Sequence, residues 1–367
     1  MAPARKGRSP LVWLVLAAVL LGVGAWLMRG AEPPEREKHG PVNLPNRMTR
    51  TEERKNAERR TLLVPTVEDA GLVQEPSRPK DPVLALMPSS VKRGAVVGEY
   101  NAIINSELGP KLTQCLFGDG DDKFLRDLRD AGVDPVNGID RVAMIDDNVV
   151  ITGDFKNVKW KELVRPDTVK DYGPHAQLFE TTKWDGGTET LGVWNGQMFI
   201  AGGDEASIKA TLDRLEGRGI TGPPVLDDSM AYGEVYGVMN AAPVAAMLRK
   251  SEPKLADLIL QSAKSMQVHM DVGHDVGMVA DVTPGDPAMS EELRRTLGGA
   301  LSLARMQAAA KGDNDTAGIL DLARVQAAGG AGAFRLEAGL PHDFMKKALD
   351  ECIAERRRGF PRADAGP

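Results

Sequence analysis

The chain has 367 residues, 42% of them hydrophobic, and a formal net charge of −6 at pH 7. This length suits two or three domains, and the hydrophobic content is that of a globular protein. The negative charge argues against nucleic acid as the main partner, and an aromatic content of 5% leaves little material for a base-stacking surface.

The N-terminal segment predicts a single membrane-spanning helix. Residues 11–28 are an unbroken apolar run that would reach about 27 Å as a helix, close to the ~30 Å hydrocarbon core of a bilayer. Trp13 and Trp26 lie near its two ends and Arg29 closes it, so these three residues are expected at the membrane interfaces. The short basic tail, residues 1–10, favours a cytoplasmic N-terminus. We therefore expect a signal anchor in the inner (cytoplasmic) membrane, with the remaining chain exported to the periplasm.

A cleaved signal peptide is the alternative interpretation of this segment. Val23-Gly24-Ala25 has the small residues of a cleavage site, and cleavage after Ala25 would release the chain.

Residues 29–92 predict a solvated tether between the membrane and the folded part. Many prolines fall here, and residues 46–60 mix charges of both signs without an apolar face. Such a segment buries too little apolar surface to offset the entropy of ordering it. The expected order of the chain is a cytoplasmic tail at 1–10, a transmembrane helix at 11–28, a tether at 29–92, α+β units at 93–218 and 229–359, and a disordered tail at 360–367.

The first unit opens with a strand at 94–100, followed by a helix. A second helix is expected at 121–132, with Phe124, Leu125 and Leu128 facing inward. The later elements are a hairpin turning at 146–148, a short helix at 157–164, a meander over 175–203 that turns at Asn195-Gly196, and a helix at 204–217.

The second unit repeats this order. The expected elements are a strand at 230–239, a helix after Asn240 that restarts near 251–253, a hairpin of 265–273 and 274–282, a long helix from 290 to 310, strands at 324–330 and 333–339, and a last helix over 340–359.

Two local similarities favour duplication of one unit. Gly98-Glu99 returns as Gly233-Glu234, and Asn101 and Asn240 each open a helical pattern after a strand. We therefore expect an α+β protein of two tandem, diverged units, each a mainly antiparallel sheet with helices on one face.

Gly132-Val133-Asp134-Pro135, followed by Gly138-Ile139-Asp140 and the order of elements above, resembles a bacterial envelope family described as a domain of unknown function. The resemblance covers roughly residues 84–357. It implies an exported α+β protein and implies no catalytic residue.

One glycine-rich motif has two interpretations. Residues 201–206, Ala-Gly-Gly-Asp-Glu-Ala, can be compared with the Gly-Gly-Asp-Glu-Phe loop of diguanylate cyclases, in which glycines approach a phosphate and acids hold magnesium. Ala206 replaces the phenylalanine, and export would remove the nucleotide supply. We favour a strand end at Gly202-Gly203 and a helix N-cap at Asp204, and predict no nucleotide or other cofactor.

The histidines limit metal and acid–base chemistry. His269 and His274 flank a turn together with Asp271 and Asp275, so a surface metal clip is conceivable there. No paired-histidine helix signature is present, and alternating strand residues at a turn are the simpler account. We predict no catalytic residue and no metal site.

Cys115 and Cys352 lie on the apolar faces of two expected helices. In an oxidising compartment they could form a disulfide that closes a very long loop, and buried free thiols are the alternative.

These observations favour a single-pass membrane protein of the bacterial envelope without catalytic activity, acting as an adaptor or binding component of an envelope assembly with a protein partner. The alternatives are an enzyme with its site between the two units, or a carrier of a lipid or peptide. An adaptor predicts an exposed apolar or strand-edge patch, an enzyme predicts converging acids or histidines in a cleft, and a carrier predicts a dry cavity.

Overall fold

The computed structural model of the protein describes residues 42–45, 81–117, 126, 129–164, 166–182, 188–219 and 222–359. The first half contains α3 (Pro82–Ala85), β1 (Gly94–Gly98), α4 (Tyr100–Ile104), α5 (Gly109–Phe117), β2 (Ile139–Ile145), β3 (Asn148–Gly153), α7 (Trp160–Val164), β4 (Thr168–Asp171), β5 (Ala176–Thr182), β6 (Thr188–Trp194), β7 (Met198–Ala201) and α8 (Glu205–Leu215). The second half contains the 3-10 helix η1 (Asp228–Met230), β8 (Val235–Asn240), α9 (Ala241–Leu248), α10 (Pro253–Ser262), β9 (Ala263–Asp271), β10 (Val276–Pro284), α11 (Pro287–Ala310), α12 (Asn314–Asp321), β11 (Arg324–Ala327), β12 (Phe334–Leu340) and α13 (His342–Gly359).

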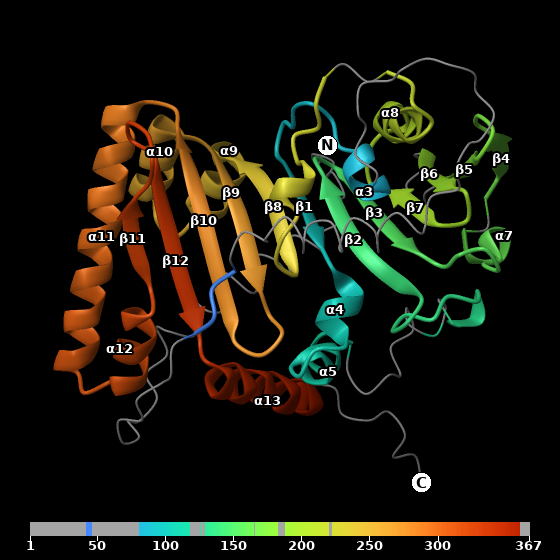
Figure 1. Cartoon of the computed structure of the whole chain (residues 1–367). Helices are drawn as coiled ribbons and strands as arrows, with labels where there is room; N and C mark the ends of the chain where they lie inside the picture. Colours follow the sequence, from blue (N-terminus) through green and yellow to red (C-terminus); the bar gives the residue numbers. More distant parts are fainter. Residues whose placement is uncertain are drawn as a thin grey trace, which may run out of the picture.

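The strands form one antiparallel sheet that runs across the molecule (Figure 1). The strand order is β11-β12-β10-β9-β8-β1-β2-β3-β7-β6-β5-β4. The two halves meet at β1 and β8, which pair antiparallel from Gly94↔Met239 to Gly98↔Val235. The expected α+β class with antiparallel strands is therefore confirmed, and the strands of both halves share a single sheet.

The central pair of strands requires close backbone contact. A Cβ atom at Gly237 of β8 would lie 2.4 Å from the carbonyl oxygen of Ala95 and 2.7 Å from the Cα of Val96, both on β1. Real Cβ atoms essentially never come this close to backbone atoms. The absence of a side chain at Gly237 thus allows the two halves to join.

The two Gly-Glu pairs of the sequence are spatial neighbours rather than equivalent positions. Gly98 ends β1 and Glu99 is the N-cap of α4, whereas Glu234 precedes β8. The backbone N–H of Glu99 donates to the carbonyl oxygen of Glu234 at 2.7 Å, because the strands are antiparallel. Asn240 is the N-cap of α9, as predicted. Asn101 lies inside the first turn of α4, so the expectation that it opens that helix is wrong.

Two parts of the expected tether contact the folded body. Val83, Leu84 and Leu86, in and just after α3, are fully buried in the main core of the first half, so the expected start of the folded part at residue 93 is too late. Residues 42–45 lie on the second half, where a Cβ at Gly277 would be 2.2 Å from the carbonyl oxygen of Asn43. Burial of apolar side chains stabilises both contacts, and a solvated spacer does not describe them.

The expectation of helices on one face is wrong for the first half. Met198 and Ile200 of β7 pack in the same core cluster as Ile208 of α8. Phe199, between them, packs in a second cluster with Trp160 of α7, its ring stacked on the indole with centroids 5.1 Å apart. Successive strand residues point to opposite faces of a sheet, so α7 and α8 cover opposite faces.

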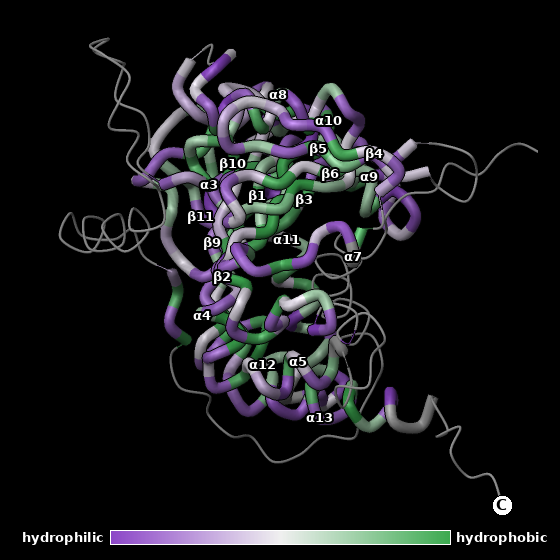
Figure 2. The backbone as a smooth tube through the Cα atoms, turned by 90° about the vertical axis from the view of Figure 1, so that its right-hand side faces the viewer, coloured by the Kyte–Doolittle hydropathy of each residue, from purple (hydrophilic) through white to green (hydrophobic). Residues whose placement is uncertain are grey.

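The second half has its own core beneath α9, α10 and α11, which lie around β9, β10 and β12. In Figure 2 the more hydrophobic stretches gather on central strands such as β1 and β3. Helices α11 and α12 lie at the β11 end of the sheet, far from α7 and β4 (Figure 1).

Several turns and caps follow local sequence rules, as predicted. Asn195 and Gly196 have φ values of 51° and 62° in the tight turn between β6 and β7. Asp204 is the N-cap of α8 and accepts from the backbone N–H of Ser207 at 2.7 Å, which confirms its capping role.

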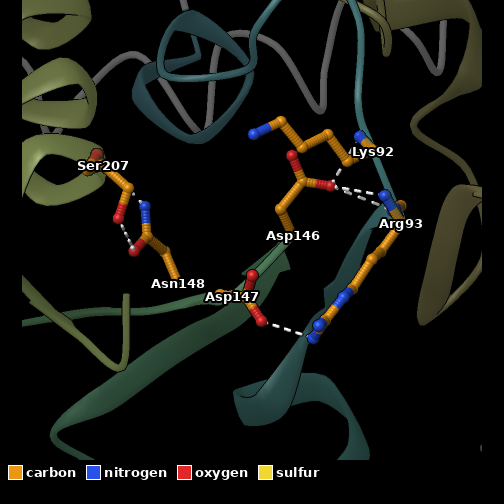
Figure 3. A network of polar contacts seen from close by, with 7 residues as sticks. Lys92, Arg93, Asp146, Asp147, Asn148 and Ser207 are labelled. Atoms are coloured by element: carbon orange, nitrogen blue, oxygen red, sulfur yellow. Dashed lines mark hydrogen bonds and ion pairs between the residues drawn. The ribbon is translucent and has the colours of Figure 1, made fainter. Parts of the chain in front are cut away.

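The β2–β3 turn holds neighbouring segments together (Figure 3). Asp146, with a φ of 52°, accepts at Oδ1 from the backbone N–H groups of Lys92 at 2.9 Å and Arg93 at 2.7 Å. Asn148 exchanges hydrogen bonds with α8, because the Ser207 hydroxyl donates to its Oδ1 at 3.0 Å and its Nδ2 donates to the Ser207 carbonyl. The turn thus fixes the chain entering β1 and the start of α8.

A buried ion pair connects α3 to the sheet. Arg141 lies on the buried face of β2, where its Nη1 donates to both oxygens of Asp81 at 2.7 and 2.8 Å. Asp81 also caps α3 through the backbone N–H of Val83. Burial alone lowers the pKa of Arg141, but the carboxylates of Asp81 and Glu99 outweigh it, so its pKa lies above the usual value.

Among the described residues no helix combines the length and apolar character needed to cross a bilayer. The run at 11–28 lies outside these residues, as do most of the expected helix at 121–132 and the tail at 360–367.

Removal of the Asp81 charge should strongly destabilise the fold. We expect Asp81→Asn to cost roughly 3–5 kcal/mol in the free energy of unfolding, because it removes the carboxylate charge that pairs directly with the buried guanidinium of Arg141. Asp147→Asn is the control, since it removes the exposed ion pair with Arg93 and should cost about 1 kcal/mol or less. Urea unfolding followed by circular dichroism measures both values. If both variants lost the same small amount of unfolding free energy, the prediction would be wrong.

Candidate functional site

Helices α5 and α13 lie side by side below the sheet, although they come from opposite ends of the described chain (Figure 1). Cys115 of α5 and Cys352 of α13 form a disulfide, with their Cα atoms 5.7 Å apart. Lys111 and Asp350 form an ion pair between the same helices. Arg356 donates from Nη1 to the carbonyl oxygen of Cys115 at 2.9 Å. Of the two alternatives that the sequence left open for the cysteines, the structure contains the bridge.

Three potential metal ligands meet at the N-terminal end of α13. Glu107 lies between α4 and α5, His274 lies in the loop between β9 and β10, and His342 is the first residue of α13. One ligand atom from each residue lies within 4.8 Å of the others. His274 Nδ1 is 2.8 Å from Glu107 Oε2, and His342 Nε2 is 3.5 Å from Glu107 Oε1.

The backbone nearby holds His342 in a defined orientation. Its Nδ1 lies 3.0 Å from the carbonyl oxygen of His274, so this nitrogen carries the proton and donates. Its Nε2 atom then faces the carboxylate of Glu107. The backbone N–H of His342 donates to Asp275 Oδ1 at 2.9 Å, and the two imidazoles stack with centroids 4.5 Å apart.

The charges around the cluster favour ionised groups. The hydrogen bond with His274 lowers the pKa of Glu107, and the charges of His342 and Lys346 act in the same direction. The hydrogen bond with Glu107 raises the pKa of His274, and the negative charges of Asp275 and Asp343 raise it further. Glu107 and His274 are about three-fifths exposed, whereas His342 is 18% exposed and forms the inner wall of the cluster.

The metal clip that the sequence made conceivable at His269 and His274 does not form, because His269 lies in the core, away from the cluster. His269 is fully buried and stacks on Tyr232 with ring centroids 3.6 Å apart. Its Nδ1 donates to the carbonyl oxygen of Tyr232 at 3.1 Å, and its Nε2 accepts from Gln267 at 2.8 Å. His269 is thus a core residue, and burial lowers its pKa.

The cluster could not be found from the sequence because its members are far apart in the chain. Glu107 and His274 are separated by 167 positions, and His274 and His342 by 68. No local spacing rule connects such residues. The only local signal was the position of His274 in a hairpin turn.

Two motifs that the sequence analysis singled out have structural roles. The 201–206 motif ends β7 and caps α8, as described above. In the Gly-Val-Asp-Pro motif, Asp134 accepts from the backbone N–H groups of Val136 at 2.9 Å and Asn137 at 3.2 Å, which lowers its pKa. The Tyr100 hydroxyl donates to the carbonyl oxygen of Pro135 at 2.7 Å. This motif shapes the loop that leads into β2.

A shallow depression of about 360 Å³ lies on the α7 side of the first half. Its lining residues are Val158, Lys159, Trp160, Lys161, Gln177 and Phe179. Trp160 packs edge-on against Phe155 and stacks on Phe199, so its aromatic surface is used in packing. We assign this depression no ligand.

The expected interface residues Trp13, Trp26 and Arg29 lie outside the described residues. Comparison of the chain with protein-family models, with curated proteins and with solved structures finds no match.

The burial of His269 should make the protein less stable in acid. The pKa of His269 in the folded state is lower than its unfolded value of about 6.5, so the unfolded chain binds the proton more readily. This contribution to stability is complete above about pH 6.5 and is lost as the pH falls towards the folded pKa. Asp281 and Arg335, whose charges act on the pKa of His269 in opposite directions, form an ion pair with each other.

The variant His269→Gln removes this contribution, and between pH 7 and 5 it should lose less stability than the original protein. Urea unfolding at several pH values gives the free energy of unfolding of both proteins. The difference between the two at each pH isolates His269, because the other titrating groups are the same in both. His175→Gln, at an exposed position, is the control. Parallel stability curves for the original protein and His269→Gln would refute the prediction.

Proposed function

We propose that the chain is a membrane-anchored protein of the bacterial envelope whose exported α+β module binds another protein without catalysing a reaction. The apolar run at 11–28 supplies the anchor, and residues after 29 lie in the periplasm. The observation that carries the binding role is an exposed apolar surface at one end of the sheet.

That surface lies on α11. The exposed large apolar side chains among the described residues are Leu260 on α10, at 40% exposure, and Leu303 and Met306 on α11, at 52% and 62%. Leu303 and Met306 are three positions apart and so share one helix face. We call this face, with Leu303 and Met306 at its centre, the α11 face. Apolar side chains gathered in this way suit a partner protein with a complementary apolar surface.

The disulfide supports export. Disulfides persist in oxidising compartments such as the periplasm and are rare in the reducing cytosol. Cys115–Cys352 connects helices from the two halves across a sequence separation of 237 residues. In the chain-entropy model, a loop of this size contributes up to about 5 kcal/mol.

We also infer that the two halves are diverged copies of one unit. The strand order reads β1-β2-β3-β7 outward from the centre in one direction and β8-β9-β10-β12 in the other. In each half a helical pair follows the first strand, and a helix follows the last of these four strands. Strand β6 beside β7 matches β11 beside β12, so the insertions are α7, β4 and β5 in the first half and α11 and α12 in the second.

The membrane topology can be tested with fusions after Pro367. A reporter enzyme that folds only in an oxidising compartment should be active there, and a fluorescent reporter that matures only in the cytosol should be dark. The same fusions on a chain lacking residues 1–30 are the controls and should give the reverse result. Activity of the cytosolic reporter on the full chain would refute export.

The α11 face can be tested by charge substitution. We expect Leu303→Asp and Met306→Asp to reduce partner recovery after crosslinking in cells at least tenfold while leaving the thermal unfolding temperature nearly unchanged, because both side chains are more than half exposed. Ala210→Asp, at an exposed position of α8, is the matched control and should retain the partner. Equal recovery from all three variants would exclude this face as the binding site.

A further inference from the structure

We propose that Glu107, His274 and His342 bind one divalent transition-metal ion, with Zn²⁺ as the best match, and that the ion joins the two halves at the α5–α13 end of the sheet. This inference stands apart from the proposed adaptor role and does not depend on it.

The donor set has the chemistry of a transition-metal site. Two imidazoles and one carboxylate are a common protein ligand set for Zn²⁺, and imidazole also suits Cu²⁺ and Ni²⁺. Mg²⁺ and Ca²⁺ prefer oxygen ligands alone. Two imidazoles and one carboxylate therefore favour a transition-metal ion over Mg²⁺ or Ca²⁺.

The spacing of the donor atoms fits a shared ion. Ligands about 2.0–2.2 Å from a metal ion place their donor atoms roughly 2.9–3.5 Å apart. The measured separations are 2.8 Å for His274 Nδ1 to Glu107 Oε2 and 3.5 Å for His342 Nε2 to Glu107 Oε1. One ligand atom from each of the three residues lies within 4.8 Å of the others, and Glu107 and His274 are the exposed side chains that would adjust to a shared ion.

The surrounding hydrogen bonds are those of a supported ligand. Metal-binding histidines commonly donate their second ring nitrogen to a backbone carbonyl or a carboxylate, which fixes the tautomer. His342 does this through Nδ1 to the carbonyl oxygen of His274, leaving Nε2 as the free donor atom. Its backbone is held by Asp275, so the ring is in place before an ion binds.

The position of the site gives the ion a structural role. Glu107 belongs to the first half, and both histidines belong to the second. The disulfide lies ten residues further along α13 than His342, or about 15 Å along the helix axis. The ion would thus hold the start of α13 as the disulfide holds its later part. The carboxylates of Asp275 and Asp343 add negative charge near the site, and Lys346 is the cation that acts on Glu107.

The test uses the full-length, tag-free protein in detergent, treated with a chelator and then dialysed. Titration with ZnCl₂ in a calorimeter should give one ion per chain, and CoCl₂ should give the visible absorption bands of a cobalt ion with nitrogen ligands. Zinc should raise the thermal unfolding temperature and slow hydrogen exchange of backbone amides in the first turns of α13. MgCl₂ should do neither.

Glu107→Gln and His274→Gln should each weaken zinc binding at least tenfold and abolish the cobalt bands. Both side chains are more than three-fifths exposed, so the variants are expected to fold. His175→Gln, an exposed histidine elsewhere, is the matched control and should bind zinc as the original protein does. If His342→Gln fails to fold, the two exposed positions still decide the outcome.

Absence of saturable one-to-one zinc binding would overturn the proposal. Equal losses in His175→Gln and His274→Gln would also overturn it, because they would show non-specific binding to surface histidines. Zinc binding without slower exchange in α13 would overturn the structural role of the ion.

Discussion

The antiparallel pairing of β1 with β8 is the contact on which the rest of the structure depends. Five residue pairs join the halves, and Gly237 lets the backbones approach. Because the pairing is antiparallel, the end of β1 meets the start of β8, and Glu99 and Glu234 become neighbours. The same pairing connects polar groups across the junction, since the Tyr236 hydroxyl donates to Glu99 Oε1 at 3.0 Å. One sheet thus replaces two separate domains and gives both halves a common frame.

This common frame explains why the α5–α13 end concentrates long-range contacts. Helix α13 ends the second half, yet it packs against α5 of the first half rather than only against its own sheet. A helix docked across a junction gains apolar burial but few local constraints on its position. The disulfide and the Lys111–Asp350 ion pair restrict it, and the Glu107–His274–His342 cluster lies where its first turn meets the hairpin loop. The polar and covalent contacts therefore collect where the junction itself offers the least restraint.

The sequence predicted features that local physics decides and missed those that depend on distant partners. Asn195-Gly196 and Asp204 follow turn and capping rules that involve only a few neighbouring residues. Helix α3 was missed because a helix of four residues among prolines has no periodicity, and its burial depends on α8 and Arg141. The position of β8 beside β1 and the cluster at Glu107 could not be derived, since no local pattern encodes contacts across 137 or 167 positions. His269 shows the same limit, because a hairpin position does not reveal which face of the strand is buried.

The contact of residues 42–45 with the second half changes what the expected tether can do. A free tether over residues 29–92 would let the module move far from the membrane, but the chain touches the sheet at Asn43, beside Gly277. Only residues 29–41 then lie between the apolar run and the folded body, and fully extended they reach at most about 45 Å. Gly277 pairs with Gly339 in the sheet, and each lies three positions from one histidine of the cluster. The contact of residues 42–45 therefore lies at the same end of β10 and β12 as that cluster. Helix α11 lies at the other extreme of the second half, at an outer end of the sheet rather than below it (Figure 1), so its exposed side chains Leu303 and Met306 are carried on a different element from the cluster.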